Sequence, residues 1–292
     1  IPVALINPAG GQTLCSGQTT AISFSSPVIN TVFNWTVNQT NLTGTSPSSG
    51  TTIAQTLSVI LPSVGTATYE VTPTSNGCIG TPVQVSVNVK PIPDFSAVPT
   101  QAPICSGDAT SIALSPSLTN TNLTWTVVQN GVSGALNDSG TSIIQVLETT
   151  GFDVGNAIYT ITPELNGCVG SPISVTVIVN PLPRPSLTGG NICVDALGVS
   201  FTNYTLDSGL NDTDYTFQWF LDGVLQNFSN GNTFIASVAG NYSVIATNIA
   251  TGCVSSSVFA TVTSSLPATS ISAVGSFVFF VIFFINLLSE IF

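Results

Sequence analysis

The sequence predicts an all-β protein made of three small sandwich domains in a row, and three observations carry this prediction. The first is that its six Cys and three Trp form three Cys–Trp–Cys frames: Cys15, Trp35 and Cys78; Cys105, Trp125 and Cys168; Cys193, Trp219 and Cys253. The second is that the frame recurs after 90 and then 88 residues, close to the roughly 100 residues of a small sandwich. The third is that short segments of alternating Val, Ile and Thr lie between turn residues, as in strands of such folds.

The intervals within the frames separate the first two copies from the third. Cys to Trp is 20 residues and Trp to Cys is 43 in both of the first copies, but 26 and 34 in the third. We expect repeats at residues 1–90, 91–181 and 182–265, followed by an apolar tail at 266–292. The Pro-x-Pro steps Pro91-Ile92-Pro93 and Pro181-Leu182-Pro183 predict short, stiff linkers between them.

Each repeat reads as about seven short strands joined by turns. In the first copy we expect strands at residues 20–24, 33–37, 53–61, 66–71 and 83–89, with a Gly- and Ser-rich loop at 44–50. The second copy restates this pattern at 123–127, 159–162 and 175–179, and the third places strands at 217–221 and 240–244. The dipeptides Asn76-Gly77, Asn166-Gly167 and Asp222-Gly223 predict type I′ hairpin turns.

A Trp packed beside a disulfide is typical of immunoglobulin-like domains. The sequence therefore predicts a core built on Trp35, Trp125, Trp219, Tyr69, Tyr159 and Tyr242. In antibody domains the second Cys follows the corner Tyr by about two residues, whereas here Cys78 follows Tyr69 by nine. We expect the disulfide to lie at an end or edge of the sandwich, and we favour pairing within each repeat, although six Cys allow many connectivities.

The charge content excludes several classes of function. Only 5% of the residues are charged, with two cations (Lys90 and Arg184), 13 acids and no His, against about 25% charged residues in an average domain. Two cations do not neutralise a nucleic-acid backbone or dock on an anionic membrane. Without His there is no evident base and nucleophile pair, and no pair of carboxylates is marked for glycoside hydrolysis. We expect no enzyme, no cofactor and no nucleic-acid partner.

Two Cys in every repeat, with no CxxC motif and no His, favour disulfides over metal binding. The sequence therefore predicts an exported, extracellular protein. No signal peptide stands at Ile1 and the chain has no Met, so we expect a mature or partial product whose export signal lies upstream.

The motif ICSG, followed by tWTV and by YxVTPxxNGCxGxPxxVxVxVxP, resembles the PKD-like and Ig-like repeats of very large cell-surface proteins of Bacteroidetes-type bacteria. Gln218-Trp219-Phe220-Leu221-Asp222-Gly223 with Gly240-Asn241-Tyr242-Ser243-Val244 is similar to their Ig-like variant. The resemblance covers about residues 1–264. It implies the tandem immunoglobulin-like (PKD-like) fold and a structural or adhesive role in an adhesin, gliding protein or fibre, often exported by the type IX pathway. It implies no catalytic residue, and the family's usual C-terminal sorting domain is not visible.

Two weaker kinds of site remain as candidates. The acceptor motif N-x-S/T occurs at Asn34, Asn38, Asn41, Asn122, Asn137, Asn203, Asn211, Asn227 and Asn241. Covalent glycans there would keep a nearly uncharged surface hydrated, although an Asn- and Thr-rich chain also forms such motifs by chance. Asp207, Asp212 and Asp214 are weak candidates for Ca²⁺ ligands, but their spacing fits no EF-hand loop and is equally that of a polar turn.

The tail breaks with the rest of the composition. Its candidate assembly residues are Phe277, Phe279, Val281, Phe283 and Ile285. One interpretation is a strand donated to a neighbouring copy, which gives head-to-tail filaments. Others are a short membrane helix, a segment packed on its own repeats, or a sequence foreign to the native chain.

We expect a subunit of an extracellular bacterial fibre, stalk or adhesin that forms a head-to-tail homopolymer. The alternatives are a carbohydrate-binding surface module using Phe228 or Phe234, and a membrane-tethered ectodomain.

Overall fold

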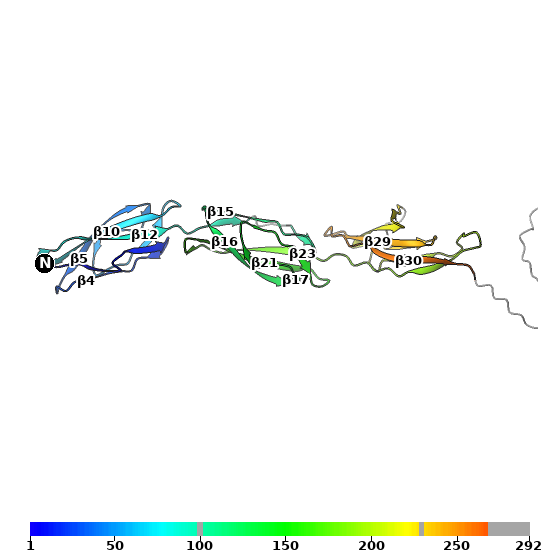
Figure 1. The fold of residues 1–292 in the computed structure, drawn as a ribbon, viewed down its shortest axis with the longest axis horizontal. Coiled ribbons are helices and arrows are strands. Elements are labelled where there is room, and N and C mark those ends of the chain that lie inside the picture. Colours follow the sequence, from blue (N-terminus) through cyan, green and yellow to red (C-terminus); the bar gives the residue numbers. More distant parts are fainter. Residues whose placement is uncertain (98–101, 228–230, 268–292) are drawn as a thin grey trace, which may run out of the picture. The chain divides into compact units, whose positions relative to one another are not determined.

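The computed structural model describes residues 1–97, 102–227 and 231–267. The chain divides into two compact units, Ile1–Leu182 and Pro183–Phe292. The described residues form strands, turns and loops, with no helix among them. The predicted fold class is confirmed: the chain folds into immunoglobulin-like β-sandwiches in tandem, two of them within the first unit (Figure 1).

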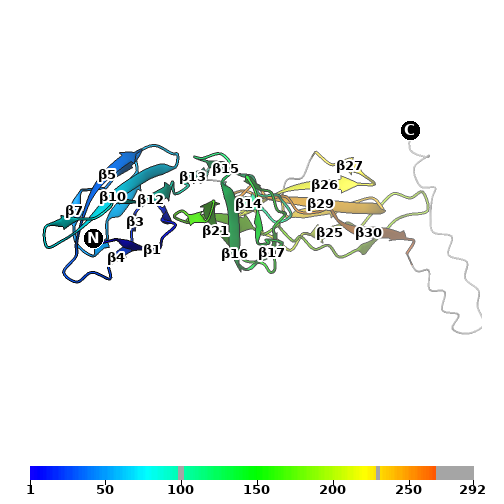
Figure 2. The same ribbon diagram turned by 60° about the vertical axis from the view of Figure 1, so that its left-hand side comes forward.

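The first sandwich has one large sheet facing smaller ones. The large sheet has the order β2-β12-β10-β5-β7, with β11 paired to β10. Its strands are β2 (Gln12–Cys15), β5 (Val32–Thr40), β7 (Ser48–Ser49), β10 (Gly65–Ser75), β11 (Cys78–Ile79) and β12 (Val83–Lys90). The smaller sheets contain β1 (Leu5–Asn7), β3 (Gln18–Thr19), β4 (Ile22–Ser25), β6 (Leu42–Thr43), β8 (Thr52–Ile53) and β9 (Thr56–Val59). Figure 2 shows β1 and β4 lying side by side.

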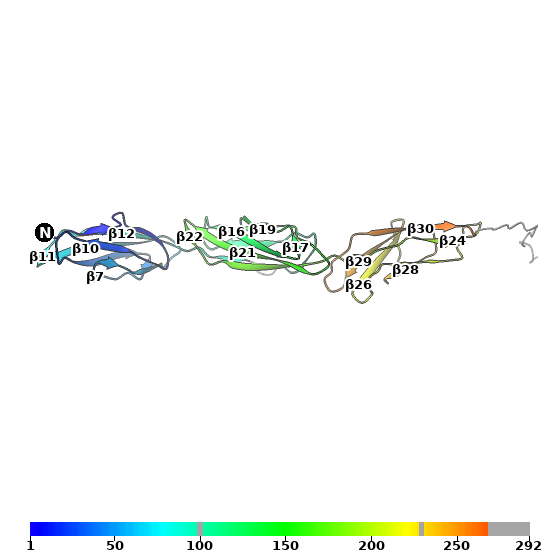
Figure 3. The same cartoon turned by 90° about the horizontal axis from the view of Figure 1, so that it is seen from below.

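The second sandwich repeats this topology. Its large sheet has the order β14-β23-β21-β16-β18, with β22 paired to β21. These strands are β14 (Ile104–Cys105), β16 (Asn122–Asn130), β18 (Asp138–Ser139), β21 (Gly155–Leu165), β22 (Cys168–Val169) and β23 (Ile173–Asn180). The opposite layer contains β13 (Phe95–Ala97), β15 (Ile112–Pro116), β17 (Val132–Ser133), β19 (Ser142–Ile143) and β20 (Glu148–Thr149). Strands β16, β21 and β22 are neighbours in Figure 3.

The second unit holds a sandwich of simpler build. A five-stranded sheet, β24-β30-β29-β26-β27, faces the pair β25-β28. The strands are β24 (Gly190–Cys193), β25 (Tyr204–Asp207), β26 (Tyr215–Leu221), β27 (Val224–Leu225), β28 (Thr233–Ala236), β29 (Gly240–Asn248) and β30 (Val258–Ser265).

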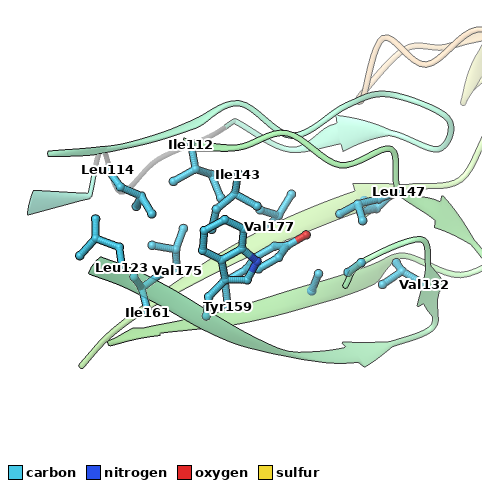
Figure 4. Packing of buried hydrophobic residues seen from close by; sticks show 14 of the residues in the cluster. Ile112, Leu114, Leu123, Val132, Ile143, Leu147, Tyr159, Ile161, Val175 and Val177 are labelled. Carbon is cyan, nitrogen blue, oxygen red and sulfur yellow. The ribbon is translucent and has the colours of Figure 1, made fainter. Parts of the chain in front are cut away.

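The period-two pattern of the sequence sets which side chains enter the core. In β12, Val85, Val87 and Val89 are buried and the residues between them are exposed, because successive side chains of a strand point to opposite faces. Figure 4 shows the equivalent core of the second repeat, where Val175 and Val177 face Ile112 and Ile143 from the opposite layer. Burying such side chains is the main source of stability, about 1.5–3 kcal/mol for each one.

The predicted aromatic core residues lie inside. Tyr69, Tyr159 and Trp219 are fully buried, and Trp35, Trp125 and Tyr242 are nearly so. The turns Asn76-Gly77 and Asn166-Gly167 have positive φ at both residues, as a type I′ turn requires.

One expected strand region is divided in the structure. The strand region expected at 53–61 consists of two strands, β8 and β9, which pair with different sheets. The chain breaks around Gln55, whose side chain turns inward to the hydroxyl of Tyr69. The tail residues Phe277, Phe279, Val281, Phe283 and Ile285 lie outside the described residues.

Candidate functional site: a disulfide clasp between repeats

The first Cys of each repeat lies where the chain leaves the sandwich. Strand β2 runs parallel to the last strand, β12, and their register places Cys15 beside Lys90. The same parallel pairing places Cys105 beside Asn180 and Cys193 beside Ser265. Because parallel strands end at the same edge of a sheet, each of these Cys marks the exit end of its repeat.

The second Cys lies at the opposite end, where the chain enters. Strand β10 runs antiparallel to β12, and the Asn76-Gly77 turn at its end places Cys78 opposite Ser75. Strand β21 does the same for Cys168, which lies opposite Leu165. The two Cys of one repeat are therefore separated by the length of an 11-residue strand, about 35 Å at the rise of a β-strand.

The structure pairs Cys15 with Cys168, across the junction of the first two repeats. Their Cα atoms are 5.6 Å apart, within the range that a disulfide requires. Beside the bond, the Lys90 ammonium donates a hydrogen bond to the carbonyl oxygen of Asn166 at 2.8 Å. We call this arrangement the clasp: Cys15 and Lys90 from the exit end of one repeat, and Asn166 and Cys168 from the entry end of the next.

Pairing within each repeat, which the sequence favours, is wrong for Cys15 and Cys168. The reason is geometric, because the two Cys of a repeat lie at opposite ends of its sheet, and a disulfide spans at most about 7 Å between Cα atoms. Of the other four, Cys105 and Cys253 are also disulfide-bonded, whereas Cys78 and Cys193 carry free thiols. The clasp Cys168 is buried and the free Cys78 is exposed.

A hydrogen-bond network that the sequence analysis missed holds the core of each of the first two repeats. In the second repeat, Trp125 Nε1 and Gln145 Nε2 both donate to the carbonyl oxygen of Leu136, at 3.1 and 2.9 Å. Gln145 Oε1 accepts from the Tyr159 hydroxyl at 2.9 Å and from the Leu136 N–H at 3.0 Å. Burial raises the pKa of Tyr159 to about 12.

The first repeat has the same network with Gln55. Trp35 Nε1 and Gln55 Nε2 donate to the carbonyl oxygen of Ser46, and Gln55 Oε1 accepts from the Tyr69 hydroxyl at 2.8 Å. Both Gln stand 20 residues after the Trp and 14 before the Tyr. This shared spacing was the signal that would have marked them in the sequence.

Most of the candidate glycosylation residues are accessible. Eight are exposed and Asn41 is half-buried, with its amide nitrogen donating to the carbonyl oxygen of Ser63. The side chains of Asn137, Asn211 and Asn241 make hydrogen bonds to nearby loops or strands. The exposed residues include Asn34, Asn38, Asn122, Asn203 and Asn227.

Each Asp candidate accepts a hydrogen bond, Asp207 and Asp214 within their own loop and Asp212 from a neighbouring segment. Asp207 accepts from the N–H of Gly209 and Asp214 from the amide of Asn211, while Asp212 accepts from the N–H of Asn232. Within residues 1–97, 102–227 and 231–267, no group of three His, Cys, Asp or Glu side chains is arranged to hold a metal ion.

Of the two aromatic residues named for carbohydrate binding, Phe234 is half-buried within the third repeat. Phe234 packs between Trp219 and Tyr242, with ring centroids 5.6 and 5.5 Å away. Phe228 lies outside the described residues. Among the residues that the structure describes, no helix is long and apolar enough to cross a membrane.

Comparison with known proteins identifies the first two repeats. The family model of the PKD-like domain matches residues 12–93 and again residues 102–183, which together exceed half of the chain. A search of curated proteins finds no significant match. PKD-like domains carrying disulfides are typical of extracellular structural or adhesion modules rather than of enzymes.

Solved structures similar to the chain are multidomain proteins at low identity. The human Desmocollin-1 ectodomain is 9% identical with a TM-score of 0.31, covering 91% of this chain, which spans only 62% of that one. The complex of Dpr2 Ig1-Ig2 with DIP-Theta Ig1-Ig3 is 13% identical with a TM-score of 0.32, covering 91% and 100%. The Bacteroides ovatus glucan-utilisation protein SGBP-B, solved with a mixed-linkage heptasaccharide, is 13% identical with a TM-score of 0.23, covering 90% and 70%.

Proposed function

Because the chain belongs to the PKD-like domain family, we propose that it is a non-enzymatic structural segment of a bacterial cell-surface fibre, stalk or adhesin. Its domain boundaries fall near residues 90, 181 and 265. In this role the segment transmits mechanical tension between the cell surface and the far end of the fibre, stalk or adhesin. The observation that supports this role is the Cys15–Cys168 disulfide.

The clasp changes the path that a force takes through the chain. Cys15 lies near the start of the first repeat and Cys168 near the end of the second, 153 residues later. Tension applied at the two ends of this unit passes from one Cys to the other through the covalent S–S bond. Residues 16–167 are then closed in a covalent loop that cannot extend, whereas β2 and β23 lie outside this loop and still carry load through their sheets.

Force spectroscopy on the full chain tests this role. Peptide handles are placed before Ile1 and between Leu182 and Pro183. Reduction, or Cys15→Ser, is expected to add about 500 Å of extension, because 153 residues are released at 3.3–3.6 Å each. The matched control Cys78→Ser removes a free thiol and is expected to extend like the parent chain. Equal extension of the oxidised parent and Cys15→Ser contradicts this role of the clasp.

Head-to-tail assembly of copies through the C-terminal tail belongs to the same proposal. It is supported by the apolar sequence of residues 277–285, which needs covering by another chain. Electron microscopy of the purified chain is expected to show fibres, and deletion of residues 275–292 is expected to leave monomers. Fibres that persist after the deletion mean that the tail is not the connector.

We also propose that some exposed Asn side chains carry glycans. The supporting observation is the exposure of Asn34, Asn38 and Asn122 on a surface with few charges. Intact mass of natively produced protein before and after deglycosylation is expected to differ. A mass equal to that of the bare chain contradicts the proposal.

A further inference from the structure

We propose that Cys78 and Cys193 are the two open halves of a second clasp, which joins this chain covalently to the next repeat at either end. The inference rests on the proposed head-to-tail assembly and names its chemical link. Each half would pair with the complementary Cys of another PKD-like repeat. In a homopolymer that partner is a second copy, with Cys193 of one copy bonded to Cys78 of the next.

The entry half at Cys78 has the backbone of the occupied half at Cys168. Both Cys follow an Asn-Gly turn, with φ values of 47° and 79° at Asn76 and Gly77, and 53° and 84° at Asn166 and Gly167. Both are the first residue of a two-residue strand that pairs with the longest strand of the repeat. The sulfur of Cys78 is therefore presented from the same position as the sulfur that already forms a clasp.

The surroundings of the two entry halves also match. The N–H groups of Gly80 and Gly170 donate to the carbonyl oxygens of Pro73 and Pro163, each at 2.8 Å. A Cβ added at Gly170 would collide with the carbonyl oxygen of Pro93 in the linker, and one added at Gly80 would collide with the same atom of Pro2. The chain thus enters the first repeat along the same path by which it enters the second.

The exit half at Cys193 matches the occupied half at Cys15. Each is paired in parallel with the end of the last strand, at Ser265 and Lys90 respectively. The next residue donates its N–H to the carbonyl oxygen of that strand residue, at 2.9 Å for Ser16 and 3.0 Å for Val194. The turn after Cys193 is longer, and Thr202 Oγ1 accepts from the Cys193 N–H, where Gln18 does so for Cys15.

Cys78 and Cys168 differ in exposure, as expected if Cys78 lacks the partner that covers Cys168. Cys168 is fully buried in its clasp, whereas the equivalent Cys78 is exposed. Thiol exchange requires an accessible sulfur, and Cys78 meets this requirement. Cys193 is half-buried, as are the bonded Cys15 and Cys105 in the same place, so this degree of cover is compatible with a disulfide.

Bond formation is a thiol–disulfide exchange with an external disulfide, such as an oxidised thiol buffer or a disulfide oxidoreductase. The thiolate of one Cys attacks the external disulfide and releases one thiol. The thiolate of the other Cys then attacks the mixed disulfide and releases the second thiol. Two protein thiols are oxidised to one disulfide, and the external disulfide is reduced to two thiols.

The experiment uses the full chain in a buffer of reduced and oxidised glutathione, followed by non-reducing electrophoresis and mapping of linked peptides. The parent is expected to give a ladder of covalent multimers that reduction collapses, with a peptide joining Cys78 to Cys193. Cys78→Ser and Cys193→Ser are each expected to lose the ladder. An equimolar mixture of the two variants is expected to give dimers and nothing larger, because only one complementary pair of thiols remains.

Several outcomes overturn the proposal. One is a mixture that stays monomeric, and another is either variant alone dimerising as readily as the mixture, which indicates random oxidation of exposed thiols. Peptide mapping of the parent covers the case in which a variant fails to fold, and a Cys78–Cys78 link there counts against the clasp.

Protein isolated from its native surface separates the two sources of the partner. A Cys78–Cys193 peptide identifies a second copy, and a link to a Cys of another sequence identifies a further repeat of a longer polypeptide. Either supports the clasp, and free thiols at both positions overturn it. Fibres of the parent chain that contain no Cys78–Cys193 link would mean that this inference fails while head-to-tail assembly holds, whereas absence of fibres would mean that the assembly itself fails.

Discussion

The second and third repeats place a Trp and a Tyr at the centre of the same kind of sandwich, yet they satisfy the two side chains differently. In the second repeat, Gln145 joins the Tyr159 hydroxyl to the loop that holds Trp125. In the third, Trp219 Nε1 donates to the carbonyl oxygen of Gly231 and the Tyr242 hydroxyl to that of Val238.

A different kind of side chain connects the Trp and the Tyr in each of these two repeats. Phe234 stacks between Trp219 and Tyr242 in the third repeat, whereas the second repeat has the polar Gln145 linking its pair. Buried polar groups need partners, and these can come from a side chain or from the backbone. The comparison teaches that the frame fixes where the aromatic residues lie and leaves open how their polar atoms are satisfied.

The largest expected effect is on the aromatic stack of the third repeat. Phe234→Ala is expected to lower the free energy of unfolding of that repeat by about 3 kcal/mol, because a packed ring is lost and a cavity remains. Guanidinium unfolding followed by Trp fluorescence measures it. The exposed Phe259 supplies the control, and Phe259→Ala is expected to change stability by less than about 0.5 kcal/mol. Equal losses in the two variants would refute the role of the stack.

Gln145→Leu converts the polar link of the second repeat into an apolar contact. We expect a loss of about 2 kcal/mol, because the partly buried Tyr159 hydroxyl loses its hydrogen-bond partner. Gln55→Leu is expected to do the same in the first repeat. Gln84→Leu, on the exposed face of β12, is the matched control. If Gln145→Leu leaves the free energy of unfolding unchanged, an apolar side chain between Trp and Tyr serves the second repeat as well as it serves the third.

A smaller effect is expected at the turn that presents the clasp. Gly167 has φ +84°, with open space around its Cβ position, so Gly167→Ala costs only backbone strain, about 1 kcal/mol. Gly10 has no neighbour within 4 Å of a Cβ and no positive φ, and Gly10→Ala is expected to be nearly neutral. Thermal unfolding of the two variants compares them, and equal shifts would argue against a strained turn.

The smallest expected effect is a loss of stability that appears only at alkaline pH, where the buried Tyr side chains ionise. Burial raises the pKa of Tyr69 and Tyr159 from 10.0 to about 12, so the folded repeats hold these protons more tightly than the unfolded chain. Their contribution to stability is complete below pH 10 and is lost as pH rises from 10 through 12. Ultraviolet titration of tyrosinate, with unfolding measured at each pH, checks this. Tyr159→Phe is expected to flatten the profile, and an unchanged profile would count against it.

Much of the fold could be predicted from the sequence, because the patterns that indicate it are local. The alternation in Val83–Lys90, the Asn-Gly turns at 76 and 166 and the period of the Cys–Trp–Cys frame each depend on residues close together in the chain. The division of the strand region expected at 53–61 was not visible, because it depends on Gln55 turning inward to Tyr69, which comes 14 residues later.

The sequence by itself determined that the chain is a row of alike all-β repeats, each with one Cys before and one after a core Trp. It could not determine the pairing, because in a tandem repeat a bond within one copy and a bond to the next leave the same spacing in every copy. Only the tertiary structure decided it. The parallel pairing of β2 with β12 places Cys15 at the exit of its repeat, and the hairpin of β21 and β22 places Cys168 at the entry of the next. Two Cys at opposite ends of one sheet are too far apart to bond, whereas two at facing ends of adjacent repeats lie within reach.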